Sequence, residues 1–438
     1  MVPPPMADTN EGPEFELPRR FGRYVLFDHI GRGGMAEIYL ARGTTQMGAS
    51  RLAVVKVVLN RYSEDPSFAG MLISEAKLAA RLSHRNIVQT FDLGREEGRL
   101  FIAMQYVEGF DVTQLLRKLS QKKIGLPAEF GFYIVLEMLQ ALDYAHRCSD
   151  DEGNALGIVH RDVSPSNVLV SLEGEVKLCD FGIARAVTDI AELPEGALEG
   201  KAAYMSPEQA RGERIDGRAD VFSASIILWE LLCGRRMYKA QPGREVIDIA
   251  RAGEVPPLVD RGLPEYAQLQ AIVSKGLAPN RDDRYATAGA MARELEDYVI
   301  RNRLRASPMK LGAFLTEQFE TELVSVRRDL EQRALSVAAE VPVEVIPDLG
   351  RYDAAPAPAA TLPPRLMPDE LAPLALPSSG PPLPAPRLDP APAPVVPVPA
   401  PPSPVTSAAP AKRPVALMAV AALVLLGVLG VVASQLLH

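Results

Sequence analysis

One group of polar residues near the middle of the chain constrains the fold more than any other feature. Asp162 and Asn167 lie five residues apart in a loop-like segment, and Asp180 stands at the end of a second apolar run, directly before Phe181 and Gly182. Carboxylate and amide oxygens are the ligands that Mg²⁺ prefers. The spacing predicts that these segments bring magnesium ligands and a further carboxylate to one point.

Short strand-like runs precede long helical ones along the globular part of the chain. Beyond about residue 128, apolar residues recur at intervals of three and four. We therefore expect an α+β fold in which a strand-rich small lobe precedes a helical large lobe. The expected strands are Tyr24–Ile30, Ile38–Ala41, Leu52–Leu59, Val88–Leu93 and Leu100–Tyr106, and the expected helices are Ser67–Leu82, Ala128–Arg147, Ala219–Cys233, Ala267–Gly276 and Ala288–Ile300.

A glycine-rich segment lies between two of the expected strands. Gly31, Gly33 and Gly34 are typical of a hairpin turn whose backbone can approach phosphate oxygens closely, although an ordinary hairpin has the same composition. Lys56 follows in the middle of an apolar strand, where its charge needs a partner. Glu75, on the next helical stretch, is the candidate for that partner.

In this order, the motifs resemble those of the eukaryotic-like (Hanks-type) protein kinases, most closely the bacterial Ser/Thr kinases that are tethered to membranes. The resemblance extends from about Phe21 to Arg301 and implies the bilobal protein-kinase-like fold. It implies transfer of the γ-phosphoryl group of ATP to Ser or Thr hydroxyls of protein substrates, with Mg²⁺, or Mn²⁺ in its place.

The resemblance also implies a role for each residue. Asp162 would orient the substrate hydroxyl and accept its proton, and Asn167 and Asp180 would hold the magnesium ions. Lys56, paired to Glu75, would hold the α and β phosphates. The residues implied to surround the nucleotide are Ile30, Gly31, Gly33, Gly34, Ile38, Val54, Met104, Gln105, Val107, Asp111 and Leu169.

Three further positions match structural residues of the family. Glu208, in Ser206-Pro207-Glu208, is expected to form an ion pair with Arg284. Asp220 is expected to anchor the loop that carries Asp162, which is called the catalytic loop below.

Thr188 is the one candidate for autophosphorylation between Gly182 and Ser206, because the only other hydroxyl there belongs to the structural Tyr204.

Two departures from the family look like a reciprocal exchange. Ser164 stands where most Ser/Thr kinases have a lysine, and Lys201 stands where they have a threonine. We therefore expect Lys201 to reach Asp162 and the γ-phosphate, while Ser164 supplies a bridging hydrogen bond. The alternative is that Lys201 points to solvent and the enzyme is slower.

The chain ends carry no globular pattern. We expect residues 1–20 to be disordered, the kinase domain to occupy 21–301, and a helical extension to occupy 302–353, with one or two amphipathic helices over Lys310–Leu335. About half of the 39 prolines fall between Pro356 and Pro410, so 354–413 is expected to be an extended linker. It is either a spacer or a docking strip for a proline-recognising domain.

Residues 415–433 form an uncharged apolar run preceded by Lys412 and Arg413. This length suits one transmembrane helix, and the basic pair places the kinase domain on the cytoplasmic face of an inner or plasma membrane. A buried helix of a soluble protein is the alternative. The N-terminus lacks the apolar core of a signal peptide.

Composition excludes other classes of protein. The 47 basic and 55 acidic residues give a net charge of -8, which argues against a nucleic-acid-binding protein. Three cysteines are too few for a disulfide framework. Two function classes stand beside the active Ser/Thr kinase: a catalytically impaired pseudokinase acting as a membrane-tethered scaffold, and a kinase for tyrosine or small molecules. Self-association for trans-autophosphorylation is a further expectation.

Overall fold

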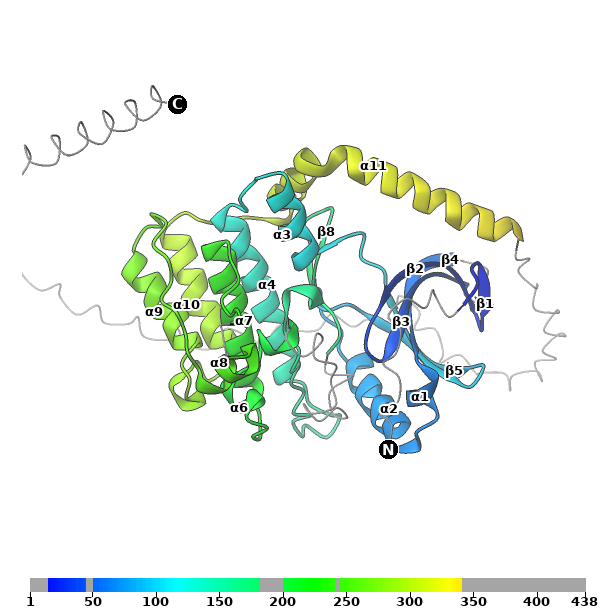
Figure 1. The fold of residues 1–438 in the computed structure, drawn as a ribbon, viewed down its shortest axis with the longest axis horizontal. Helices are drawn as coiled ribbons and strands as arrows, with labels where there is room; N and C mark the ends of the chain where they lie inside the picture. The colour runs from blue at the N-terminus through cyan, green and yellow to red at the C-terminus, as the bar shows by residue number, and fades with distance from the viewer. Residues whose placement is uncertain (1–14, 45–49, 182–199, 241–243, 341–438) are drawn as a thin grey trace, which may run out of the picture. The chain divides into compact units, whose positions relative to one another are not determined.

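Six antiparallel strands form the sheet of the small lobe (Figure 1). The computed structural model describes residues 15–44, 50–181, 200–240 and 244–340. In β4 the fully buried side chains of Ala53, Val55 and Val57 alternate with partly buried ones, which places one face of the sheet on the lobe's core. The strand order in the sheet is β1 (Arg19–Phe21), β2 (Tyr24–Arg32), β3 (Ala36–Thr44), β4 (Ser50–Val58), β6 (Arg99–Gln105) and β5 (Thr90–Glu96).

The small lobe begins earlier than expected. Phe15 is buried, and its ring lies 5.7 Å from the ring of Phe21 and 5.6 Å from that of Tyr39. The expectation of disorder through residue 20 and of a domain starting at 21 was therefore wrong for residues 15–20. Phe15 and the partly buried Leu17 are too few apolar residues to show a strand or helix periodicity in the sequence, but both pack against this end of the core.

Helix α2 (Pro66–Ala80) covers the other face of the small-lobe sheet, after the short α1 (Asn60–Ser63). Phe68, Leu72 and Ala76 of α2 pack in one cluster with Leu100 and Ile102 of β6. A separate three-stranded sheet follows, made of β7 (Gly109–Asp111), β8 (Val168–Ser171) and β9 (Val176–Leu178). The loops at the ends of β8 and β9 carry the acidic motifs of the sequence.

Helix α7 (Gly217–Cys233) is the centre of the large lobe. Fifteen of its residues, Ala219 to Cys233, are buried, so it lacks the polar face of a surface helix. The helices α4 (Ala128–His146), α9 (Tyr266–Gly276) and α10 (Ala288–Arg301) pack against it and confirm the predicted ones within a few residues. Not predicted were α3 (Val112–Gln121), α6 (Pro207–Ala210) and α8 (Val246–Ala252).

The predicted extension contains a single long helix, α11 (Pro308–Glu340), which begins on the large lobe. Leu311, Leu315 and Phe319 are buried there. Gly174 lies in the β8–β9 turn at φ +82°, and a Cβ atom on it would lie 2.0 Å from the carbonyl oxygen of Pro308. The bare backbone of Gly174 therefore allows the start of α11 to approach the turn.

Farther along, α11 extends toward the small lobe (Figure 1). Glu322 Oε2 lies 2.5 Å from Lys118 Nζ of α3, and Arg333 Nη1 lies 2.8 Å from Asp28 Oδ1 of β2. The helix thus contacts both lobes with one continuous element.

The predicted linker at 354–413 and the apolar run at 415–433 lie outside the described residues, as does Thr188. In the part of the chain that is described, none of the helices combines the length and the apolar character that crossing a membrane requires.

Candidate active site

A buried carboxylate fixes the loop that carries Asp162. Asp220, on the first turn of α7, is 1% exposed and accepts hydrogen bonds of 2.8 Å from the backbone nitrogens of His160 and Arg161. The Nε2 atom of His146 lies 2.7 Å from the same carboxylate. Burial opposes the charged form, but the bond to His146 and its charge outweigh burial, so the pKa of Asp220 is lowered. The predicted anchoring role of Asp220 is confirmed.

The backbone of the loop is held in a left-handed conformation. Arg161 has φ +65°, and Asp180 has φ +59°, a region that residues other than glycine adopt rarely. Such backbone conformations cluster at functional sites, where the surrounding contacts enforce them. Here the two bonds to Asp220 supply that enforcement at Arg161.

Asn167 links the two acidic motifs. It ends the short 3-10 helix Pro165–Asn167, and its Nδ2 atom donates a 2.7 Å bond to the carbonyl oxygen of Asp162. Its own carbonyl oxygen accepts a 2.9 Å bond from the backbone nitrogen of Cys179, the residue before Asp180. The loop after β9 is thereby attached to the catalytic loop, as the spacing predicted.

Lys56 of β4 and Asp180 form an ion pair, with 3.1 Å between Nζ and Oδ1. Burial lowers the pKa of Lys56, but the charge of Asp180 and the hydrogen bond to it more than compensate, so the pKa is raised and the ammonium stays charged. Glu75 belongs to α2, and its side chain is outside the part that is described. The pairing of Lys56 with Glu75 therefore stays a prediction.

Lys201 lies beside the catalytic carboxylate, with its Nζ atom 3.1 Å from Asp162 Oδ2. It precedes the buried Ala202 and Ala203, which fix its backbone in the large-lobe core. The Ser164 hydroxyl lies 3.0 Å from Ser166 Oγ, so in this conformation it is bonded to Ser166 rather than bridging to Asp162 as we expected. The two hydroxyls stand only two residues apart on the loop, which favours the local bond.

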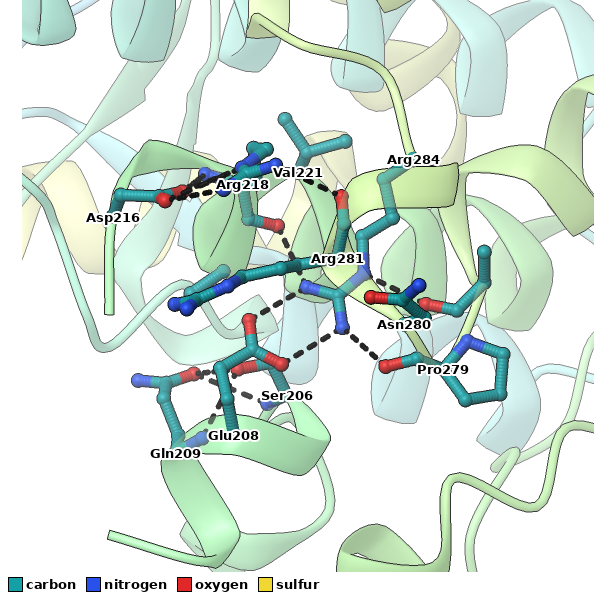
Figure 2. A network of polar contacts seen from close by, with 12 residues as sticks. Ser206, Glu208, Gln209, Asp216, Arg218, Val221, Pro279, Asn280, Arg281 and Arg284 are labelled. Atoms are coloured by element: carbon teal, nitrogen blue, oxygen red, sulfur yellow. Dashed lines mark hydrogen bonds and ion pairs between the residues drawn. The ribbon is translucent and has the colours of Figure 1, made fainter. Parts of the chain in front are cut away.

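The chain segment that follows Gly182 in the sequence, named the activation segment below, ends at Glu208 in a buried ion pair with the large lobe (Figure 2). The guanidinium of Arg284 donates bonds of 2.7 and 2.8 Å to the two carboxylate oxygens of Glu208. Their side chains are 0% and 3% exposed. The predicted pair is confirmed.

Gln209 is a contributor to the site that sequence reasoning missed. Its Nε2 atom donates a 2.9 Å bond to the carbonyl oxygen of Arg161, which joins the activation segment to the catalytic loop. Gln209 also forms a capping box with Ser206 at the start of α6. The spacing of Ser206 and Gln209 is the sequence signature of that cap and was the signal available.

The residues implied to surround the nucleotide meet between the small lobe and the β7–β9 sheet. Met104 is buried in one cluster, and Val54, Val107 and Leu169 pack against it. The β4–β6 register sets Val54 opposite Met104 and Ala53 opposite Gln105. Burial raises the pKa of the nearby Cys179 thiol, so it remains neutral in this apolar surrounding.

Other members of the predicted set lie at the edges of this region. Asp111 lies opposite Leu169 in the β7–β8 register, and its Oδ1 atom caps α3 by accepting a 2.8 Å bond from Gln114. Ile30 is 48% exposed. The β2–β3 hairpin that Gly31, Gly33 and Gly34 were expected to form is present, with Ile38 opposite Gly31.

The oxygen donors of the loop fit magnesium bound together with a nucleotide. Among the described side chains, no three His, Cys, Asp or Glu residues gather into a closed metal centre. The amide nitrogen of Asn167 donates its hydrogen bond to the carbonyl oxygen of Asp162, so its amide oxygen remains as a ligand atom for the metal. Asp180 adds a carboxylate. Mg²⁺ is usually held by one or two carboxylates together with substrate phosphates.

Comparison with known proteins places this geometry in a family. Residues 24–294 match the family model of the protein kinase domain. The chain is 38% identical over 309 residues to Tyrosine-protein kinase MasK of Myxococcus xanthus, covering 70% of this chain and 48% of that protein. It is 37% identical over 284 residues to Serine/threonine-protein kinase PknB of Mycobacterium leprae, covering 64% and 43%.

A solved structure shows the same fold. The crystal structure of the Mycobacterium tuberculosis PknI kinase domain is 28% identical, with a TM-score of 0.50, and the match covers 65% of this chain and 99% of that chain. The chain spans less than half the length of the curated relatives named above. With the catalytic loop, the Lys56–Asp180 pair and the Glu208–Arg284 pair in place, the chain belongs to the protein kinase domain family.

Proposed function

We propose that this chain transfers the γ-phosphoryl group of ATP to serine and threonine hydroxyls of proteins. The observation that carries the proposal is a pair of ion pairs, Lys56 with Asp180 and Lys201 with Asp162, whose two carboxylates lie on loops joined by Asn167. A pseudokinase scaffold is not favoured, because the site retains its cations, its carboxylates and its amide.

The chain's own residues account for most of what phosphoryl transfer requires, which is positioning and charge neutralisation. Asp162 would orient the acceptor hydroxyl and take its proton, since its carboxylate is held by the anchored loop. Lys56 would contact the phosphates as a charged ammonium. Mg²⁺, when bound by Asn167 and Asp180, would supply further neutralisation of phosphate charge.

The acceptor residue is the first point to test. Of the two curated relatives named above, PknB is named a serine/threonine kinase, whereas MasK is named a tyrosine kinase. We expect labelled phosphate from ATP to appear on Ser and Thr of a generic protein acceptor, mapped by mass spectrometry. The Asp162→Asn variant is the blank and should give no label. Label on tyrosine alone, or no label at all with the parental chain, would contradict the proposal.

Autophosphorylation between two copies is part of the same proposal. Thr188 is the expected site, and mapping the chain's own labelled residues in the same experiment tests it. A mixture of the Asp162→Asn chain with a parental chain of different length distinguishes transfer between copies, because only such transfer labels the inactive chain.

We also propose that residues 415–433 anchor the kinase to the cytoplasmic face of a membrane. The support is the uncharged apolar run and the preceding Lys412 and Arg413. The full chain is expected to sediment with membranes and to need detergent for release, whereas a chain ending at Ala411 should be recovered without detergent and remain active. A full chain recovered without detergent would overturn this.

A further inference from the structure

A large cavity lies in the large lobe, and none of the residues implied to surround the nucleotide lines it. It has a volume of about 710 Å³ and is bounded by α3, the turn after it, and the end of α7. Apolar side chains from each of these elements, Leu116, Ile124, Leu231 and Leu263 among them, contribute to its wall. The family model ends at residue 294, so the cavity belongs to the kinase domain itself.

The charged side chains around this cavity are mainly cationic. Five basic side chains and one acidic side chain line it, in a chain whose net charge is -8. All five basic residues are exposed. The lobe holds three of the guanidiniums in place: that of Arg235 over the ring of Trp229, that of Arg261 against the carbonyl oxygen of Cys233, and that of Arg236 against Tyr204. The five are Arg117, Lys123, Arg235, Arg236 and Arg261.

The one acidic residue is occupied within the lobe. Glu230 is 5% exposed and accepts bonds of 2.8 Å from the Tyr204 hydroxyl and from the backbone nitrogen of Met237. Arg236 in turn donates to the Tyr204 hydroxyl and lies over its ring. Burial raises the pKa of Glu230. A basic group entering the cavity would therefore meet cations rather than a free carboxylate.

Two residues that line the cavity lie close in sequence to Asp162 and Lys201. Pro165, which lines it, follows Asp162 by three residues, and Tyr204 follows Lys201 by three. The Tyr204 backbone nitrogen donates a 3.1 Å bond to the carbonyl oxygen of Lys201. A peptide whose hydroxyl lies at Asp162 thus has neighbouring residues within reach of the cavity, given about 3.3 Å of chain per extended residue.

We infer that this cavity is a substrate subsite that selects peptides with acidic side chains near the phosphorylated residue. The inference rests on the proposed kinase function and names its substrate class. Charge complementarity carries it: exposed cations around an apolar floor favour carboxylates and disfavour basic peptides. Arg117 and Lys123 line the cavity and are exposed, so their charges can be removed without disturbing buried side chains.

The test compares serine peptides of equal length that carry a block of glutamates, alanines or lysines before or after the acceptor. With the full chain in detergent, kcat/KM for a glutamate peptide should exceed that for the alanine peptide at least ~tenfold, with the lysine peptide poorest. In Arg117→Glu/Lys123→Glu this preference should disappear. The control Arg293→Glu/Lys310→Glu makes the same charge change at exposed positions away from the cavity and should keep the preference.

Binding without catalysis separates the two proposals. Fluorescence anisotropy with glutamate and alanine peptides that lack a hydroxyl should show tighter binding of the glutamate peptide, weakened by added salt. Tighter binding of the glutamate peptide by a chain that shows no phosphoryl transfer would contradict the kinase proposal and support the binding subsite. Equal binding and equal kcat/KM for glutamate and alanine peptides would overturn the subsite proposal. A dimer that glutamate peptides do not dissociate would also overturn it, because a second copy of the chain would then occupy the cavity.

Discussion

Replacing Lys201 by alanine is expected to lower the rate of phosphoryl transfer at least ~tenfold, with a smaller effect on the KM for ATP. Lys201 Nζ lies 3.1 Å from Asp162 Oδ2, where negative charge develops on the transferring group. A cation held at such a point contributes on the order of 2–4 kcal/mol to lowering the barrier. Single-turnover measurement of labelled phosphate transfer gives the rate directly.

The exchange of residues provides the matched control. The double variant Ser164→Lys/Lys201→Thr restores the arrangement of the wider family and should recover much of the lost rate. Ser164→Ala, which removes only the hydroxyl bonded to Ser166, should have a smaller effect than Lys201→Ala. If Lys201→Ala transfers phosphate at close to the parental rate, Lys201 has no catalytic role and its contact with Asp162 is incidental.

Replacing Arg284 by methionine is expected to destabilise the large lobe by about 3–5 kcal/mol, since it leaves a buried carboxylate without its partner. Glu208 is 3% exposed at the side chain, and Arg284 also donates to the carbonyl oxygens of Ala278, Arg218 and Pro279. All of these acceptors would lose a donor at once. Denaturant unfolding followed by tryptophan fluorescence measures the change, because Trp229 is buried in the same lobe.

Arg218 offers a control in the same network (Figure 2). It pairs with Asp216 and Asp282, but its side chain is 25% exposed and its partners are more exposed still. Arg218→Met should therefore cost no more than about 1 kcal/mol. Equal losses in Arg218→Met and Arg284→Met would show that burial of the Glu208 pair does not determine its contribution.

The Glu208 pair also has a defined pH dependence. Burial opposes ionisation, but the hydrogen bonds and charge of Arg284 outweigh it, so the pKa of Glu208 in the folded state is lowered from its ordinary 4.5. A lowered pKa gives stability that is complete above 4.5 and is lost as the pH falls through the folded-state pKa. The difference in stability between the parental chain and Glu208→Gln should therefore shrink on acidification below 4.5.

The sequence predicted the catalytic loop because its chemistry is local. Asp162 and Asn167 lie within one short segment, and the bond between them depends on their spacing alone. Asp220 was predicted through the family resemblance, although it lies 58 residues beyond Asp162 in the sequence. The main helices followed from periodicity.

Other features depend on contacts that no local pattern records. Phe15 joins the small-lobe core from beyond the expected domain boundary, and the partly buried Leu17 packs against the same cluster. The cationic cavity combines residues of α3, α7 and the segment around Arg261, which lie far apart in the chain. Its charge emerges only when the fold brings these segments together.

Helix α11 contacts both lobes and can therefore influence the angle between them. Among the side chains of α11 that are described, Phe319 is buried on the large lobe, whereas Arg333, which is exposed, pairs with Asp28 of the small lobe. An exposed pair is worth at most about 1 kcal/mol, or a population ratio of about five. The ion pair by itself therefore favours one angle between the lobes by a small free energy and does not fix that angle.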